Sequence, residues 1–418
     1  MNRFLLSFGF FLLLAASLPA ADWPHWRGPN RDGVAPGIAL PEKWPAEAPK
    51  ELWKATVGLG YSSPAIVGNT LFILARIDKN ERCIALDANT GKELWKLEYP
   101  ESFQAPDPTA GKGPNSTPTV DGDRVYILGL GGMLHCLDTT GGKVLWKHEC
   151  MKEYWGVKKS ILGDDWLPPC GASASPMVDG KNVLIPIGGK KAGAFTAFDR
   201  LTGEIAWKAL DDRSSYASPT IASPGGVKQL IGFTGTRMVG LRYSDRELLW
   251  DVPFKTRFEQ TIISPVVWKD LVIVAGEARA TIAIRVKESG GKTTHETAWT
   301  SDDLKCYLTT PVQFQDHLLG YDMRTSRLVC LSLATGEVAW TSPRLPGKYH
   351  SLVLAGDVAM CLNSEGELTV LKATVKEYQE VAKWTVAEKG TWAHLSVANH
   401  RLYVKGKENL YCYELPKG

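Results

Sequence analysis

The chain has 418 residues, of which 44% are hydrophobic and 22% are charged, and its formal net charge is +3. This balance supports a folded protein with a large core and excludes a disordered chain. Because no Lys/Arg cluster concentrates the small positive charge, the composition argues against nucleic acid as a partner.

The first residues have the pattern of an export signal. Arg3 precedes an apolar run from Phe4 to Leu14, and small residues at Ala20 and Ala21 offer a cleavage site. A run this short is typical of a signal peptide, with a membrane anchor as the alternative. We therefore divide the chain into a signal peptide (1–21), an arm (22–50) and one domain (51–418). We expect a periplasmic or secreted protein with no transmembrane anchor after cleavage.

The arm holds six prolines and three tryptophans, Trp23, Trp26 and Trp44. Proline-rich segments favour extended backbone. We expect an extended arm whose tryptophans pack on the surface of the following domain, in preference to recognising a separate peptide.

From residue 51 onward, a ten-residue motif recurs. Residues 87–96 (DANTGKELWK) return as 138–147 (DTTGGKVLWK) and 199–208 (DRLTGEIAWK), and a copy that starts at Ser332 ends at Trp340. Asp can start a turn by accepting hydrogen bonds from its own backbone, and Gly supplies the positive φ of a tight hairpin. The motif therefore predicts a turn followed by a strand that carries Trp.

Weaker copies extend the repeat to eight tryptophans 41 to 61 residues apart, the spacing of a four-stranded propeller blade. We predict that these indoles are structural and fill the wedges between neighbouring blades. A Ser/Thr-Pro pair, as at Ser63-Pro64, opens most units. The eight residues are Trp53, Trp95, Trp146, Trp207, Trp250, Trp299, Trp340 and Trp384.

The order of these units predicts how the fold closes. The pattern starts with a tryptophan strand at 51–57 and ends with the earlier strands of a unit at 392–415. Two incomplete ends can complete one sheet together, which removes exposed edges. The sequence therefore predicts an all-β fold: an eight-bladed β-propeller of four-stranded antiparallel blades, closed by pairing the N-terminal strand with the C-terminal blade. We expect it to be monomeric.

The residues three positions before each opening Pro, or its equivalent, should surround the mouth of the central channel. Rings and polar groups together suit a flat or sugar-like ligand, and the alternative is that they plug a narrow channel. The positions include Ile262 and Leu308, and the six candidate binding residues are Tyr61, Asn115, Ser173, Tyr216, Tyr349 and Trp392.

The 61-residue interval before Trp207 contains an insertion at 150–170. Loops on rigid scaffolds often carry function and Trp is a frequent hot spot, so we predict a partner-contact loop, with a lid over the channel as the alternative. Cys150 and Cys170 bracket the insertion and are candidates for a disulfide. No ligand spacing for zinc or another metal occurs. The candidate contact residues are Tyr154, Trp155, Asp164, Asp165 and Trp166.

The Asp-x-x-Thr-Gly-x-x-x-Trp units resemble the pyrroloquinoline quinone (PQQ) repeat over nearly all of residues 51–418. Two branches share it: PQQ-dependent alcohol dehydrogenases, and non-enzymatic propellers such as the outer-membrane assembly lipoprotein BamB. The first branch implies two adjacent cysteines that form a ring over bound PQQ, and a Ca²⁺ ion held by a set of Glu, Asn and Asp residues. This chain has no Cys-Cys pair and offers only Asn115, Asp164 and Asp165 as nearby ligands. Residues 22–33 resemble the start of secreted bacterial PQQ-like propellers.

We therefore expect an exported, non-catalytic propeller that binds an envelope protein, a peptide or a glycan and holds no cofactor, with no catalytic residue. The alternative is a PQQ-dependent oxidoreductase with a degenerate site for PQQ and calcium.

Overall fold

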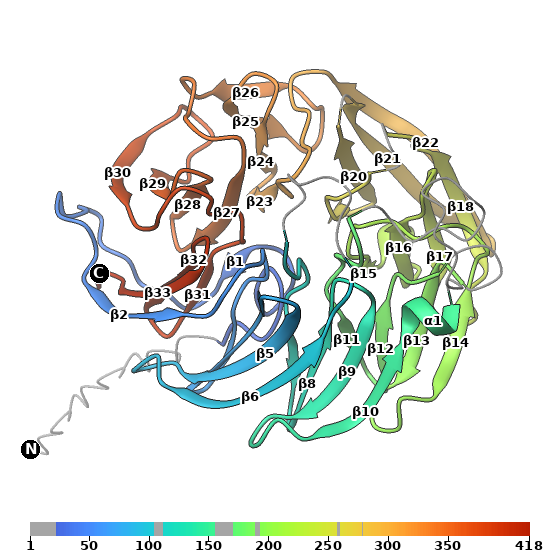
Figure 1. Ribbon diagram of the computed structural model, residues 1–418. Coiled ribbons are helices and arrows are strands. Elements are labelled where there is room, and N and C mark those ends of the chain that lie inside the picture. Colours follow the sequence, from blue (N-terminus) through green and yellow to red (C-terminus); the bar gives the residue numbers. More distant parts are fainter. Residues whose placement is uncertain (1–21, 104–111, 155–169, 189–192, 257–259, 278) are drawn as a thin grey trace, which may run out of the picture.

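The computed structural model of the chain describes residues 22–103, 112–154, 170–188, 193–256, 260–277 and 279–418. These residues form eight antiparallel sheets that stand around a central axis (Figure 1). The helical elements among them are short: α1 (Cys150–Tyr154) and the 3-10 turn η2 (Pro224–Gly226). The predicted eight-bladed β-propeller is confirmed.

Each blade runs from an inner strand beside the axis to an outer strand at the rim. Blade 1 consists of β3 (Ala65–Val67), β4 (Thr70–Ile77), β5 (Asn80–Asp87) and β6 (Glu93–Pro100), and blade 2 consists of β7 (Thr119–Asp121), β8 (Arg124–Leu128), β9 (Met133–Asp138) and β10 (Val144–Glu149). Blade 3 consists of β11 (Met177–Asp179), β12 (Asn182–Ile185), β13 (Phe195–Asp199) and β14 (Ile205–Ala209), and blade 4 consists of β15 (Thr220–Ala222), β16 (Gln229–Phe233), β17 (Arg237–Arg242) and β18 (Leu248–Pro253).

Blades 5 to 8 repeat this arrangement, and the last is built from both ends of the domain. Blade 5 consists of β19 (Val266–Trp268), β20 (Leu271–Gly276), β21 (Arg279–Ser289) and β22 (Lys292–Ser301), and blade 6 consists of β23 (Val312–Phe314), β24 (His317–Asp322), β25 (Arg327–Ser332) and β26 (Val338–Thr341). Blade 7 consists of β27 (His350–Ala355), β28 (Val358–Asn363), β29 (Glu367–Lys372) and β30 (Glu380–Thr385), and blade 8 consists of β31 (Ser396–Ala398), β32 (Arg401–Lys405), β33 (Asn409–Glu414) and β2 (Glu51–Thr56).

Hydrophobic patterning separates the middle strands of a blade from its outer strand. In blade 1, six successive residues of β4 are buried, because neighbouring blades cover both faces of that strand. The outer strand β6 is exposed at most positions. The core is therefore distributed between adjacent blades rather than gathered in one centre.

The repeated tryptophans lie on the outer strands and join each blade to the next. The indole Nε1 of Trp53 donates to the Ala88 carbonyl at 3.0 Å. Trp95, Trp146, Trp299 and Trp340 make the corresponding bond to the following turn. Each of these indoles thus has its polar atom satisfied, as a large ring at a seam requires, and all but the partly buried Trp95 are buried.

The Gly of the motif has two roles at this seam. Gly91 has φ +72°, and a Cβ added there would lie 2.6 Å from the Trp53 ring. The same close approach occurs at the equivalent glycines of blades 2, 3 and 6. Blade 4 has Arg246 at φ 66° in its turn, and this guanidinium lies 4.7 Å over the Trp207 ring. The sequence between Trp207 and Trp250 is therefore a weaker copy because Arg replaces the Gly–indole contact.

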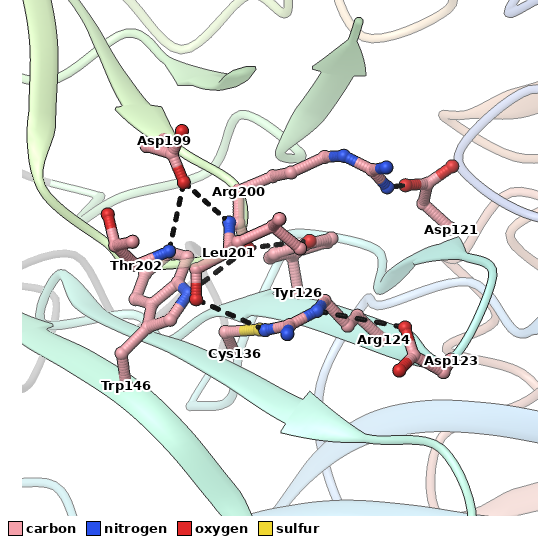
Figure 2. A network of polar contacts seen from close by, with 10 residues as sticks. All are labelled: Asp121, Asp123, Arg124, Tyr126, Cys136, Trp146, Asp199, Arg200, Leu201 and Thr202. Atoms are coloured by element: carbon pink, nitrogen blue, oxygen red, sulfur yellow. Dashed lines mark hydrogen bonds and ion pairs between the residues drawn. The ribbon is translucent and has the colours of Figure 1, made fainter. Parts of the chain in front are cut away.

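Polar contacts reinforce the seam between blades 2 and 3, as Figure 2 shows. Oδ1 of Asp199 accepts hydrogen bonds from the amides of Leu201 and Thr202, both at 2.9 Å. These bonds hold the pKa of Asp199 below its usual value. The carbonyl of Arg200 accepts hydrogen bonds from Tyr126 and Trp146 across the seam. The guanidinium of Arg200 forms an ion pair with Asp121 of blade 2. This turn therefore connects the hairpin of blade 3 to the neighbouring blade 2.

The ring closes in blade 8, where β2 pairs antiparallel with β33. The predicted closure by the N-terminal strand is confirmed. Because blade 8 is discontinuous at its outer hairpin, no turn of the motif faces Trp384, and the arm takes that place. Nε1 of Trp384 donates to the Ala46 carbonyl at 3.1 Å, and the Trp44 ring packs on it at 5.8 Å.

The first part of the arm lies inside the channel, which corrects the expectation of an extended, surface-bound segment. Trp23 is fully buried and pairs with Ile66 of β3, and β1 (Val34–Ala35) adds a parallel fifth strand to β27 on the inner side of the ring (Figure 1). Between them the backbone turns back on itself, with φ 65° at Arg27 and φ 80° at Gly28. Expectation and structure differ because the channel of eight blades is wide enough to bury this segment.

Candidate functional site

The predicted mouth positions come together around one cavity of about 600 Å³ at the end of the channel where the inner strands begin. All eight line it, because the same register in every blade brings the residue before the inner strand to the axis. They are Tyr61, Asn115, Ser173, Tyr216, Ile262, Leu308, Tyr349 and Trp392. We call this space the mouth cavity.

Blades 7, 8 and 1 supply an aromatic wall to the mouth cavity. The rings of Tyr349 and Trp392 stack with centroids 5.9 Å apart and planes at 19°, and Tyr61 lies 6.1 Å from Trp392. Trp26 of the arm also lines the cavity and packs edge-on against His394. Such a continuous ring surface can stack on the flat face of a ligand.

Blades 2 to 6 supply most of the polar groups of the lining, which we call the polar wall, together with the apolar side chains of Ile262 and Leu308. Nδ2 of Asn115 donates to Oγ of Ser173 at 3.1 Å, and the hydroxyl of Tyr216 accepts from the Cys170 amide at 3.2 Å. The hydroxyl of Tyr307 donates to the side-chain carbonyl of Gln260. These bonds fix the orientation of hydroxyl and amide groups around the cavity, which is how a binding site distinguishes polar ligands.

Two acceptor atoms near this wall lack a hydrogen-bond partner among the described residues: Oδ1 of Asn115 and Oε2 of Glu277. Both residues line the mouth cavity. A buried polar atom without a partner costs free energy that a ligand donor can recover. The cavity therefore has unused capacity to accept hydrogen bonds.

The titratable groups of the lining with shifted pKa values move away from neutrality. Burial lowers the pKa of His394 to about 3 and raises the pKa values of Tyr61, Tyr216 and Tyr349 above their ordinary range. General acid–base catalysis works best with a pKa near the working pH. These four groups remain neutral there, so they suit hydrogen bonding and stacking better than proton transfer.

Sequence reasoning missed several lining residues, namely Trp26, Gln260, Glu277, Tyr307, Lys348 and His394. For His394 a signal was present: it occupies the position directly before the opener Pro or its equivalent, where other blades have Ser63, Ser175, Ser218 and Thr310. Trp26 carries no repeat signal, because it enters the cavity only through the folding of the arm.

The insertion begins and ends on one turn of blade 2. The Cys150 amide donates to the Gly132 carbonyl at 3.1 Å, and the Ala172 amide donates to the Leu130 carbonyl at 2.8 Å. Tyr154 is the last residue of α1, whereas the candidate contacts Trp155, Asp164, Asp165 and Trp166 lie outside the described residues.

The candidate disulfide between Cys150 and Cys170 is not present in the structure. The Cys150 thiol is free and fully buried, packed with Tyr126, Trp146 and Val183 between blades 2 and 3. Cys170 instead lines the mouth cavity. The two residues bracket the same insertion, but their side chains occupy different environments, which their positions in a loop could not reveal.

A buried acid supports the turn that anchors the insertion. Oε1 of Glu81 accepts from the Leu130 amide at 3.0 Å and Oε2 accepts from the Tyr99 hydroxyl at 2.9 Å. Burial, together with the neighbouring charge of Glu101, raises the pKa of Glu81 to about 7. The base of the insertion therefore rests on a carboxyl group that titrates near neutral pH.

The family model described as outer membrane protein assembly factor BamB matches residues 45–113 and 80–342, which together span more than half of the chain. The chain belongs to the BamB family of propellers. BamB of Burkholderia pseudomallei is 27% identical over 219 residues, which are 49% of this chain and 46% of that protein. Among the described residues of this family member, no helix has the length and apolarity needed to cross a membrane.

Enzymes with the same repeat are similar as well. Quinohemoprotein alcohol dehydrogenase ADH IIB of Pseudomonas putida is 31% identical over 130 residues, covering 30% of this chain and 17% of the enzyme. The quinohemoprotein alcohol dehydrogenase of Comamonas testosteroni matches in structure with a TM-score of 0.62 at 12% identity, covering 97% of this chain and 82% of that one. The chain spans less than half the length of BamB of Burkholderia pseudomallei and of ADH IIB. The structural likeness establishes the fold alone.

Proposed function

We propose that this BamB-family propeller is a non-catalytic binding protein of the cell envelope and that the mouth cavity holds a sugar ring of a glycan ligand. The observation that carries the proposal is the division of the cavity into an aromatic wall and a polar wall. A sugar presents C–H faces that stack on rings and hydroxyl groups that bond to amides and hydroxyls. The family is described as an outer membrane assembly factor, which supports a place in the envelope.

The test is calorimetric titration of the full chain with cello-, chito- and malto-oligosaccharides, comparing the wild type with Trp392→Ala. We expect saturable binding of one sugar class and at least a tenfold loss in the variant. Trp268→Ala is the matched control, because Trp268 of β19 is partly buried and lies outside the cavity lining. Absence of binding to all three classes, or equal binding by Trp392→Ala, would reject the glycan ligand.

PQQ-dependent oxidation is the second candidate, because the dehydrogenases match the repeat. The described residues do not fit the cofactor pair well. Ca²⁺ takes six to eight oxygen ligands, whereas the cavity lining offers one carboxylate, Glu277, and the side-chain amides of Asn115 and Gln260. Within the described ranges, no group of three or more His, Cys, Asp or Glu residues could hold a metal ion. We derive no catalytic step from this site and expect no bound cofactor.

Addition of PQQ and Ca²⁺ to the purified chain tests this alternative. Micromolar binding accompanied by dye-linked alcohol oxidation would overturn the non-catalytic proposal, whereas an unchanged spectrum supports it. An envelope protein or peptide remains the alternative ligand, with the insertion as its contact. Equal partner recovery by wild type and by a Trp155→Ala/Trp166→Ala variant in an envelope pull-down would remove the insertion from that role. We expect the working form to be a periplasmic or secreted monomer.

A further inference from the structure

The arm divides the channel into two spaces. Trp26 lines the mouth cavity, whereas its neighbours His25 and Arg27 line a second cavity of about 400 Å³. This second space, the arm chamber, lies between arm residues 25–32 and the inner strands β11, β15, β19 and β23. Asn30 and Asp32 of its lining are exposed, so solvent reaches the chamber at the opposite end from the mouth cavity.

Two arginines of the arm line this chamber, and their bonding differs. All the hydrogen bonds of the Arg27 guanidinium go to backbone carbonyls, including those of Thr310 and Pro311 at 2.7 and 2.8 Å. Arg31 uses Nη2 for the Pro176 carbonyl at 2.7 Å and for Oγ1 of Thr119 at 3.4 Å. Nη1 of Arg31 is buried and has no partner among the described residues. Every guanidinium nitrogen of Arg27 therefore has a backbone acceptor, whereas Nη1 of Arg31 can still donate to a ligand.

No acid pairs with Arg31 among the described residues, although Asp32 and Asp179 also line the chamber. Burial lowers the pKa of Arg31 to about 9. Asp32 partly offsets the effect of burial at Arg27, whose pKa falls to about 10. Both guanidiniums therefore stay charged at neutral pH. A buried cation without a counter-charge is costly, and an anion in the chamber would remove that cost.

His25 adds a second unsatisfied group to the same lining, because its Nδ1 is buried and has no partner among the described residues. Burial, with the charge of Arg31, lowers the pKa of His25 to about 3 against the effect of a backbone hydrogen bond with Trp26, so the imidazole is neutral and carries one N–H. A guanidinium fork beside a neutral imidazole is suited to planar or tetrahedral oxygen anions, which accept several hydrogen bonds at once.

We infer that the arm chamber is a binding site for a small oxyanion, held by Arg31 and flanked by His25. The segment that resembles the start of other secreted propellers thus supplies a ligand site as well as a plug. The site is separate from the mouth cavity, and it does not depend on the proposed glycan ligand.

The test is calorimetric titration of the full chain, in chloride buffer, with sodium phosphate, sodium sulfate and sodium acetate in separate runs. We expect saturable binding of at least one of these anions and at least a tenfold weaker affinity in Arg31→Gln. Arg31→Lys should fall between them, because Lys keeps the charge but loses the fork. The matched control is Arg246→Gln, since Arg246 lies over Trp207 in blade 4, outside the chamber lining. Trp392→Ala should bind the anion normally.

Absence of saturable binding by all three anions, or an unchanged affinity in Arg31→Gln, would overturn the site. If Arg31→Gln does not fold by circular dichroism, the melting temperature of the wild type decides. A rise that grows with phosphate or sulfate concentration, relative to chloride at equal ionic strength, supports binding to the native state. No rise with any of the anions overturns it.

Discussion

At the outer seam a tryptophan recurs in every unit of the repeat, whereas the eight equivalent positions at the channel mouth carry six different residue types. Five of the eight seam indoles make the same hydrogen bond, to the turn of the following blade. At the mouth, the same geometric equivalence produces an aromatic wall and a polar wall. The repeated residues therefore stabilise the ring at its rim, and the variable residues at its axis give the cavity two chemically different walls.

Loss of a seam indole should have the largest effect. Trp53→Ala removes a buried ring and its bond to Ala88 at the closing blade, so we expect a loss of about 3–5 kcal/mol in the free energy of unfolding. Urea denaturation measures it. Trp207→Ala is the comparison: this ring is only partly buried and packs under Arg246, so its loss should be smaller. Equal losses would contradict the role assigned to the Gly–indole contact.

A matched pair of glycine substitutions isolates that contact. Gly91 and Gly122 both have positive φ, but only at Gly91 would an added Cβ meet an indole, and at Gly122 nothing lies within 4 Å. Gly122→Ala should cost about 1 kcal/mol from backbone strain, and Gly91→Ala should cost about 2–4 kcal/mol because overpacking adds to it. Thermal and urea unfolding of both variants give the difference, and similar values would show that the ring adjusts freely.

The base of the insertion should respond to pH. The pKa of Glu81 is raised in the folded state to about 7 from 4.5. Its contribution to stability is therefore fully present below pH 4.5 and is lost as pH rises through 7. At about 1.4 kcal/mol per pKa unit, the loss is roughly 3–4 kcal/mol. Glu81→Gln should remove this part of the pH profile, measured by urea unfolding between pH 4.5 and 8. An unchanged profile would place the titration on another group.

The smallest effect on stability is expected at the mouth. Trp392 is partly exposed, so Trp392→Ala should lower the free energy of unfolding by about 1 kcal/mol or less while it weakens glycan binding at least tenfold. Unfolding of this variant beside Trp53→Ala tests the comparison directly. A loss as large as that of Trp53→Ala would mean that the mouth ring is also structural.

The repeat made much of the site predictable. Once the opener of each blade was aligned, its place before the inner strand fixed which side chains reach the axis, and Tyr61 and Trp392 could be named together although they lie far apart in the chain. His394 shared this register and could have been found the same way. The Cys150–Cys170 pairing could not be judged, because closeness to one loop does not determine where each sulfur points.

The amino-acid order by itself determined the blades, their number and their closure, because turn residues, strand residues and Trp recur at a spacing that only a ring of sheets satisfies. Only the tertiary structure decided where the arm goes. Residues 23–35 have no periodic signal, and their burial depends on a channel that exists after eight blades have closed. The chamber around Arg31 depends on the same event, because its walls come from four blades and its charge comes from the arm.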